Sequence, residues 1–189
     1  MVQATKQMQL YSLDQLQLSD KELETKFNML AEILAFGFKM PVNIYGSLFL
    51  ALETILTKKL DLSKDFLILK LYKCLALLSE AQNAQECLIK HEHAVFEIVK
   101  FVLSLIKGNN ASTTPEVQAE SLKIIGKILL HMTDAKVIEI MPGVSSVATK
   151  VLSGEIKASS KIKIEFINIW FNIILLKYVN SLPKDQKIA

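Results

Sequence analysis

The stretch that decides the fold is residues 63–108, SKDFLILKLYKCLALLSEAQNAQECLIKHEHAVFEIVKFVLSLIKG. In its first part, apolar residues cover most of a helical wheel, and Lys70 and Lys73 share one narrow polar sector. This pattern predicts a helix that is buried on more than one side. We expect it to begin with Ser63 as N-cap and to run to about Ser79.

Two further helices are predicted within the same stretch. Asn83 followed by Glu86 has the spacing of a reciprocal cap, which indicates a short helix that ends near His91. From Glu92 to Lys107, polar residues form one stripe and branched apolar residues form the opposite face, as in an amphipathic helix. Gly108 is expected to end this helix, because glycine adopts the left-handed conformation of a C-terminal turn.

This order of a long, a short and an amphipathic helix resembles an armadillo repeat, and similar patterns stand on both sides of it. Predicted helix starts at Ser19, Ser63, Thr114 and Ser160 lie 44, 51 and 46 residues apart. Two of these spacings lie within the period of about 40–47 residues in armadillo and HEAT repeats, and the third is slightly longer. The first unit, from Ser19 to Lys59, shows two helices and is expected to be an N-terminal cap.

The unit after residues 63–108 is expected to repeat the three-helix order. A long helix is predicted from Pro115 to Met132, a short one from Asp134 to Met141, and a third from Val144 to Ser153. Pro142 and Gly143 are interpreted as the turn between the last two.

The resemblance implies an all-α fold, an armadillo/HEAT-like right-handed α-solenoid of about three helical repeats plus a C-terminal helix. We expect a flexible or loosely packed N-terminal segment in residues 1–18, a single helical repeat domain in residues 19–182, and a C-terminal tail in residues 183–189.

Signals for secretion and for catalysis are weak in this sequence. Residues 1–18 lack a basic start followed by an apolar core, so we expect an intracellular protein, cytoplasmic or nuclear, with Cys74 and Cys87 as reduced thiols. No glycine-rich phosphate loop or nucleophile motif occurs. Cys87, His91 and His93 lack the paired short spacings of a zinc site. We therefore predict no enzyme activity, no metal and no cofactor.

The charge pattern raises nucleic-acid binding as an alternative function. The net charge is +3, and residues 95–189 carry +4 while residues 1–94 carry −1. However, all 22 basic residues are lysines, and arginine is the usual bidentate reader of phosphate and guanine. A non-catalytic protein-binding module or scaffold subunit of an intracellular complex is the main prediction, because stacked helical repeats expose long recognition faces.

The resemblance also implies a binding groove, since third helices of armadillo proteins line a concave surface that holds an extended peptide. The matching positions here are His93, Glu97, Lys100 and Ser104, with Lys150 in the next unit. A plain solvated helix face is the alternative interpretation of this stripe.

The C-terminal helix, predicted over residues 160–182, has two apolar faces separated by polar residues. The preceding unit can cover only one of them. We predict that the second meets another copy of the chain or an obligate partner, unless another part of the same chain covers it. The expected interface residues are Ile164, Ile167, Trp170, Phe171, Ile174 and Tyr178.

Overall fold

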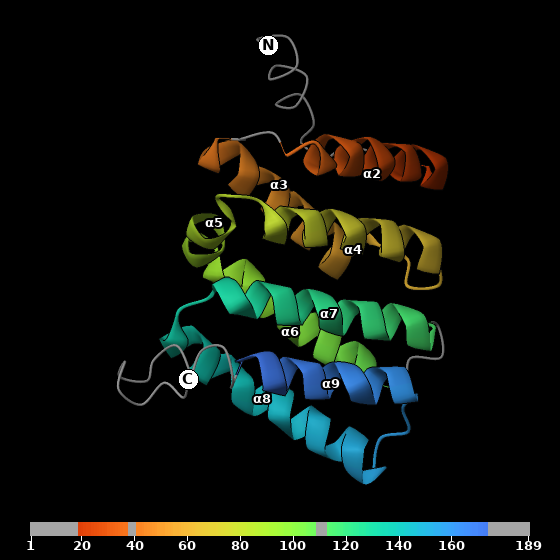
Figure 1. Ribbon diagram of the computed structural model, residues 1–189. Helices are drawn as coiled ribbons and strands as arrows, with labels where there is room; N and C mark the ends of the chain where they lie inside the picture. The colour runs from red at the N-terminus through yellow and green to blue at the C-terminus, as the bar shows by residue number, and fades with distance from the viewer. Residues whose placement is uncertain (1–18, 38–40, 109–112, 174–189) are drawn as a thin grey trace.

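The computed structural model of the chain describes residues 19–37, 41–108 and 113–173, and within these ranges every regular element is helical (Figure 1). The elements are α2 (Asp20–Ala35), α3 (Val42–Thr54) with a π-helical turn at Ile55–Lys59, α4 (Asp65–Glu80), α5 (Ala84–Lys90), α6 (Glu92–Lys107), α7 (Pro115–His131), α8 (Asp134–Ser153) and α9 (Ser160–Ile173).

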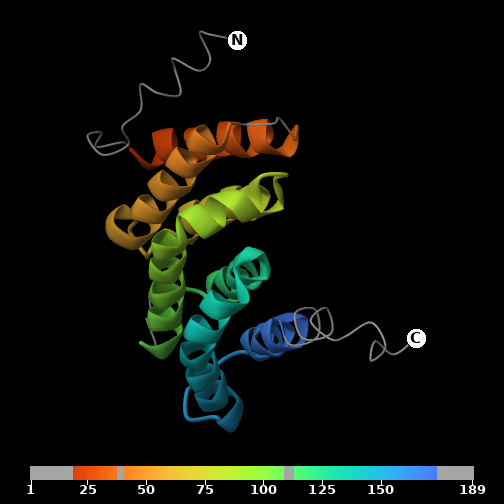
Figure 2. The same cartoon turned by 90° about the vertical axis from the view of Figure 1, so that its left-hand side faces the viewer.

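These helices form two layers. In one layer α2 packs on α4, α4 on α7, and α7 on α9; α3, α6 and α8 form the second layer behind them (Figures 1 and 2). The fully buried side chains between the layers include Tyr45, Leu71, Ile98, Ile125 and Phe166. The predicted all-α helical solenoid is confirmed.

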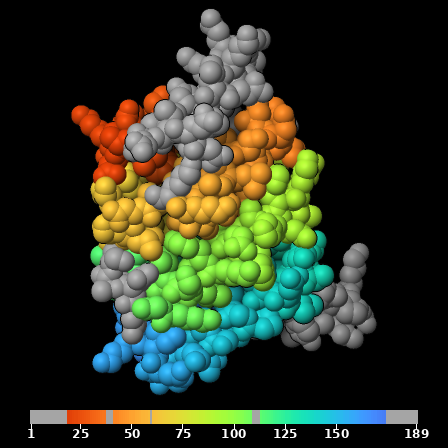
Figure 3. Space-filling view, turned by 180° about the vertical axis from the view of Figure 1, so that it is seen from behind, coloured from red at the N-terminus to blue at the C-terminus, as the bar shows by residue number. Residues whose placement is uncertain are grey.

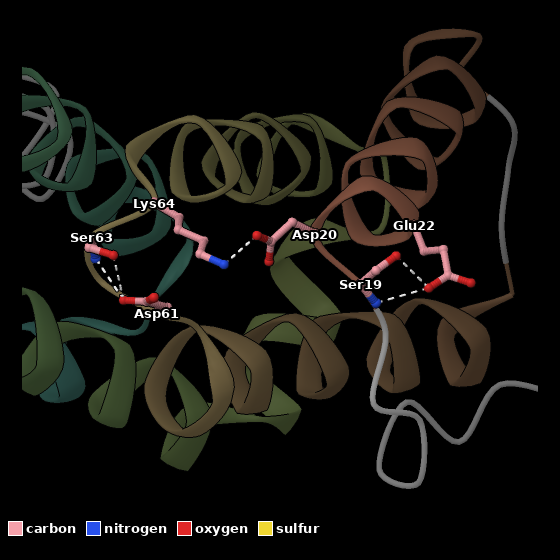
Figure 4. Close-up of polar contacts among 6 residues, drawn as sticks. All are labelled: Ser19, Asp20, Glu22, Asp61, Ser63 and Lys64. Carbon is pink, nitrogen blue, oxygen red and sulfur yellow. Dashed lines mark hydrogen bonds and ion pairs between the residues drawn. The ribbon is translucent and has the colours of Figure 1, made fainter.

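Polar contacts cap the first helix of the first unit and connect that helix to the second unit, as Figure 4 shows. The backbone N–H and the hydroxyl of Ser19 both donate to Glu22 Oε2, at 2.8 and 2.7 Å, in a capping box at the helix start predicted for Ser19. The hydrogen bonds from Ser19 lower the pKa of the Glu22 carboxyl. Lys64 at the start of α4 forms an ion pair with Asp20 in the first turn of α2.

Two predicted helix caps differ from the structure, although the helices begin and end within one residue of the predicted positions. The N-cap of α4 is Lys64, because Ser63 donates its N–H and hydroxyl to Asp61 Oδ1, at 3.0 and 2.8 Å, and thus serves the preceding turn (Figure 4). Gly108 ends α6 with a right-handed φ of −74°. Left-handed glycines occur instead at Gly37 after α2, where φ is 65°, and at Gly154 after α8, where φ is 86°.

The prediction of two helices in residues 134–153 is also wrong, since α8 is continuous and contains Pro142. A proline inside a helix removes one hydrogen bond and costs about 3 kcal/mol. The buried side chains keep helical spacing through Pro142, so packing against the rest of the core offsets this cost. They are Val137, Ile140, Val144, Val147, Ala148 and Val151.

Two glycines allow close approach between elements. A Cβ at Gly46 in α3 would lie 2.4 Å from Nε2 of His91, the residue between α5 and α6. At Gly126 in α7, a Cβ would lie 3.4 Å from Cγ1 of Ile169 in α9, which is ordinary contact. At Gly46, therefore, the His91 ring leaves no space for a methyl group. At Gly126 the contact between α7 and α9 leaves just enough space for one.

Candidate functional site

A cleft of about 270 Å³ opens between α6 and α8, which lie side by side on the face seen in Figure 3. Its apolar floor consists of Met132, Ile140 and Phe96, of which the first two are only 3% and 4% exposed. The charged and polar residues of the rim come from both helices: Glu92, His93, Glu97, Lys100, Lys136 and Glu139.

Helical spacing brings the α6 residues to one side of this cleft. His93, Glu97 and Lys100 are four and three residues apart, so their side chains lie along the same stripe of the helix. Lys100 Nζ lies 3.2 Å from Glu97 Oε1 and 4.4 Å from the centre of the Phe96 ring. The ring face therefore already carries a cation.

Lys136 connects the two walls of the cleft. Its Nζ lies 2.9 Å from Glu139 Oε2 on its own helix and 3.3 Å from Glu92 Oε1 on α6. Hydrogen bonds to Glu139 and Glu92 raise the pKa of this ammonium group above its usual value. Lys136 thus stays charged at neutral pH and holds the ends of α6 and α8 together.

The structure brings three of the five predicted groove residues together at this cleft: His93, Glu97 and Lys100. Ser104 is exposed one turn further along α6, where its hydroxyl donates to the carbonyl of Phe101 at 2.6 Å. Lys150, near the other end of α8, is paired with Glu155 at 2.8 Å. These last two residues do not line the cleft.

Sequence reasoning missed the α8 wall of the cleft. It assigned Lys136 and Glu139 to a short separate helix, although their i, i+3 spacing is typical of an ion pair on the surface of a longer one. It also placed Phe96 in no site, because an aromatic residue at the edge of an amphipathic helix is usually part of the core.

A second candidate surface is the outer face of α9. Ile164, Ile167 and Phe171 are 53%, 51% and 62% exposed. The opposite face is in the core and consists of Ile162, Phe166, Ile169 and Ile173. The two apolar faces predicted for this helix are therefore present in its described part.

The remaining predicted interface residues lie elsewhere. Trp170 is half-buried against the core, and its indole N–H donates to the hydroxyl of Ser145 in α8 at 3.1 Å. This side chain therefore packs within the chain, between the two faces. Ile174 and Tyr178 lie outside the described residues.

Reactive groups do not gather at either surface. Burial raises the pKa of the Cys74 and Cys87 thiols to about 11, so both are protonated at neutral pH and poorly nucleophilic. In residues 19–37, 41–108 and 113–173, no three His, Cys, Asp or Glu side chains are close enough to hold a metal ion. Over the same ranges, no helix combines the length and the apolar character needed to span a bilayer.

A protein-family model described as the TTI1 N-terminal TPR domain matches residues 9–186, which is nearly the whole chain. No curated protein and no solved structure matches the chain.

Proposed function

The chain belongs to the family of TTI1 N-terminal TPR domains, and from this we propose that it is a non-catalytic scaffold that binds proteins through its helical-repeat surface and associates through α9. The observation that carries this proposal is the outer face of α9. Ile164, Ile167 and Phe171 are exposed on a helix whose opposite face is fully packed. Exposed apolar patches of this kind mark association sites.

The occupant of this face in our proposal is a second copy of the chain. An α9 face that packs against its own two-fold copy needs no other complementary surface, and closed two-fold dimers are the commonest homo-oligomers. Asn168 and Asn172 are exposed beside the apolar residues and supply a polar rim.

The α6–α8 cleft is the proposed partner-binding surface, with His93, Glu97 and Lys100 on its rim. Ser104 and Lys150 are exposed on the same two helices and extend this surface in our proposal. We also propose an intracellular location, cytoplasmic or nuclear. The free, buried thiols of Cys74 and Cys87 are compatible with a reducing compartment.

Nucleic-acid binding is less well supported by the arrangement of the lysines. Many of the lysines described are close to carboxylates, which reduces the basic surface available for phosphate. The paired residues are Lys64, Lys100, Lys123, Lys127, Lys136 and Lys150. Affinity for a generic DNA duplex at two salt concentrations tests this alternative, and absence of binding at low salt removes it.

Light scattering on the purified chain tests the association through α9. We expect a molar mass above the 21.2 kDa of one chain. The double variant Ile167→Glu/Phe171→Glu should have the mass of a monomer and remain folded, while the control Thr25→Glu/Met29→Glu, at exposed positions of α2 outside the proposed interface, should behave as the wild type. A wild-type monomer whose Ile167→Glu/Phe171→Glu variant unfolds would show that this face is part of the core, and the proposal would be wrong.

A further inference from the structure

The α6–α8 cleft is suited to a particular kind of ligand by its size. Its volume of about 270 Å³ lies below the range of about 300–1,000 Å³ that is usual for cofactor and drug-sized ligands. The apolar floor of Met132, Ile140 and Phe96 is a small patch enclosed by charged residues. A space of this kind accommodates one large apolar side chain of a protein segment, with the rest of the segment lying across the rim.

The charged residues on the rim of the cleft favour a segment that carries a positive charge. Its lining includes three carboxylates, Glu92, Glu97 and Glu139, but only two ammonium groups, Lys100 and Lys136. Because Lys136 is shared between Glu92 and Glu139, these two carboxylates have one lysine between them. A further cation at this point would pair with the carboxylates, whereas a carboxylate would meet an excess of like charge.

Lys100 occupies one face of the Phe96 ring. Its ammonium lies 4.4 Å from the ring centre, so this face is not available to a further cation, and the preference of the rim for a cation comes from the carboxylates. Lys100 itself has a side chain that is 58% exposed, and its pairing with Glu97 is therefore weak and exchangeable.

From this geometry we propose that the α6–α8 cleft binds a short protein segment in which a large apolar residue stands next to a lysine or arginine. The apolar side chain fills the floor at Met132 and Ile140, and the basic side chain pairs with Glu139 and Glu92. This proposal rests on the proposed function, because it names the partner chemistry of the protein-binding surface.

Selection from a phage-displayed library of random dodecapeptides tests the proposal with the full chain. We expect enrichment of peptides in which Leu, Ile, Met or Phe lies within two positions of Lys or Arg. Fluorescence anisotropy of one enriched peptide then measures affinity, and replacing either its apolar or its basic residue by Ser should abolish binding.

Charge reversal on the protein tests the position of the site. Glu139→Lys should weaken binding of the selected peptide about tenfold or more, because attraction at the rim becomes repulsion. Glu120→Lys is the matched control: Glu120 also pairs with a lysine three residues away, Lys123, but it lies on α7 outside the cleft. This control should bind as the wild type.

Three results would overturn the proposal: no enrichment of any peptide, enrichment of acidic or purely polar peptides, or equal binding by wild type and Glu139→Lys. Ile167→Glu/Phe171→Glu should bind the peptide normally, since α9 does not line the cleft. If the chain assembles through α9 but selects no such peptide, this inference alone fails. If it neither assembles nor selects peptides, the proposed function fails as well.

Discussion

The two ends of the helical stack differ in what they present to solvent. α2 and α9 belong to the same layer, and each has one face in the core (Figure 1). The exposed positions of α2 are mainly polar, as at Lys21, Thr25 and Glu32, and the large apolar exceptions are Met29 and the C-cap residue Phe36. Those of α9 include three large apolar side chains. A terminal repeat normally turns polar residues outward, so α2 resembles a finished end and α9 does not.

The difference in exposed apolar surface between α2 and α9 corresponds to a free energy of a few kcal/mol. Fully burying a large apolar side chain stabilises a protein by about 1.5–3 kcal/mol. Because about half of each side chain is already covered at Ile164, Ile167 and Phe171, burying the remainder would contribute roughly 2–5 kcal/mol in total. A comparable gain is absent at α2, where the exposed polar groups would lose their hydration on burial.

The largest expected effect is a difference in stability between variants on the buried and on the exposed face of α9. Phe166 is fully buried, and Phe166→Ala should lower the free energy of unfolding by about 3–5 kcal/mol through loss of burial and creation of a cavity. Phe171→Ala should change the stability of the monomer by less than about 1 kcal/mol, because that side chain is 62% exposed. Urea denaturation at low protein concentration measures both. Equal losses would mean that the outer face is core.

A smaller effect on stability is expected when alanine replaces a glycine in α7, which packs on α9, or in α3 of the first unit. Gly126→Ala should raise the free energy of unfolding by up to about 1 kcal/mol, because alanine favours the helix interior and its methyl group meets Ile169 at an ordinary distance. Gly46→Ala should lower it, because the methyl group would overlap the imidazole of His91.

Thermal unfolding at a fixed protein concentration shows which of the Gly126→Ala and Gly46→Ala variants is the more stable. Adding His91→Ala to Gly46→Ala removes the overlapping ring and should recover part of the lost stability. A Gly46→Ala variant as stable as Gly126→Ala would contradict the close approach between α3 and His91.

The smallest effect concerns the capping box of α2. The folded-state pKa of Glu22 lies below its ordinary value of 4.5, because Ser19 donates hydrogen bonds to the carboxylate. The stabilisation is therefore present above pH 4.5 and is lost as the pH falls through the lower, folded-state pKa. Melting temperatures of wild type and Glu22→Gln should differ at pH 7 and converge in acid. A constant difference between them would contradict this account.

Much of the fold could be predicted from local signals. The bounds of α6 and the caps at Ser19 and Thr114 follow from hydrophobic periodicity and capping chemistry, which act within one helical turn. The continuity of α8 through Pro142 could not be predicted in this way, because the energy that overcomes the proline comes from contacts with other helices.

The candidate site, too, could be predicted only where it depends on the sequence of a single helix. The stripe of His93, Glu97 and Lys100 follows from the sequence of a single helix. The opposite wall, with Lys136 and Glu139, depends on which helix lies beside α6, and the ion pair between Lys136 and Glu92 joins residues far apart in the chain. The exposed face of α9 was predictable because one helix has two sides and a single preceding unit covers only one of them.

Cysteine cross-linking at the two ends tests the central claim most directly, because it reports which end of one chain meets another. The natural Cys74 and Cys87 are fully buried and should not react, so a single exposed cysteine can be introduced at either end. With a short bis-maleimide, Asn168→Cys on α9 should give a product of twice the 21.2 kDa chain mass, whereas Thr25→Cys on α2 should remain a single chain. No cross-linked product from Asn168→Cys, or equal products from both variants, would contradict association through α9.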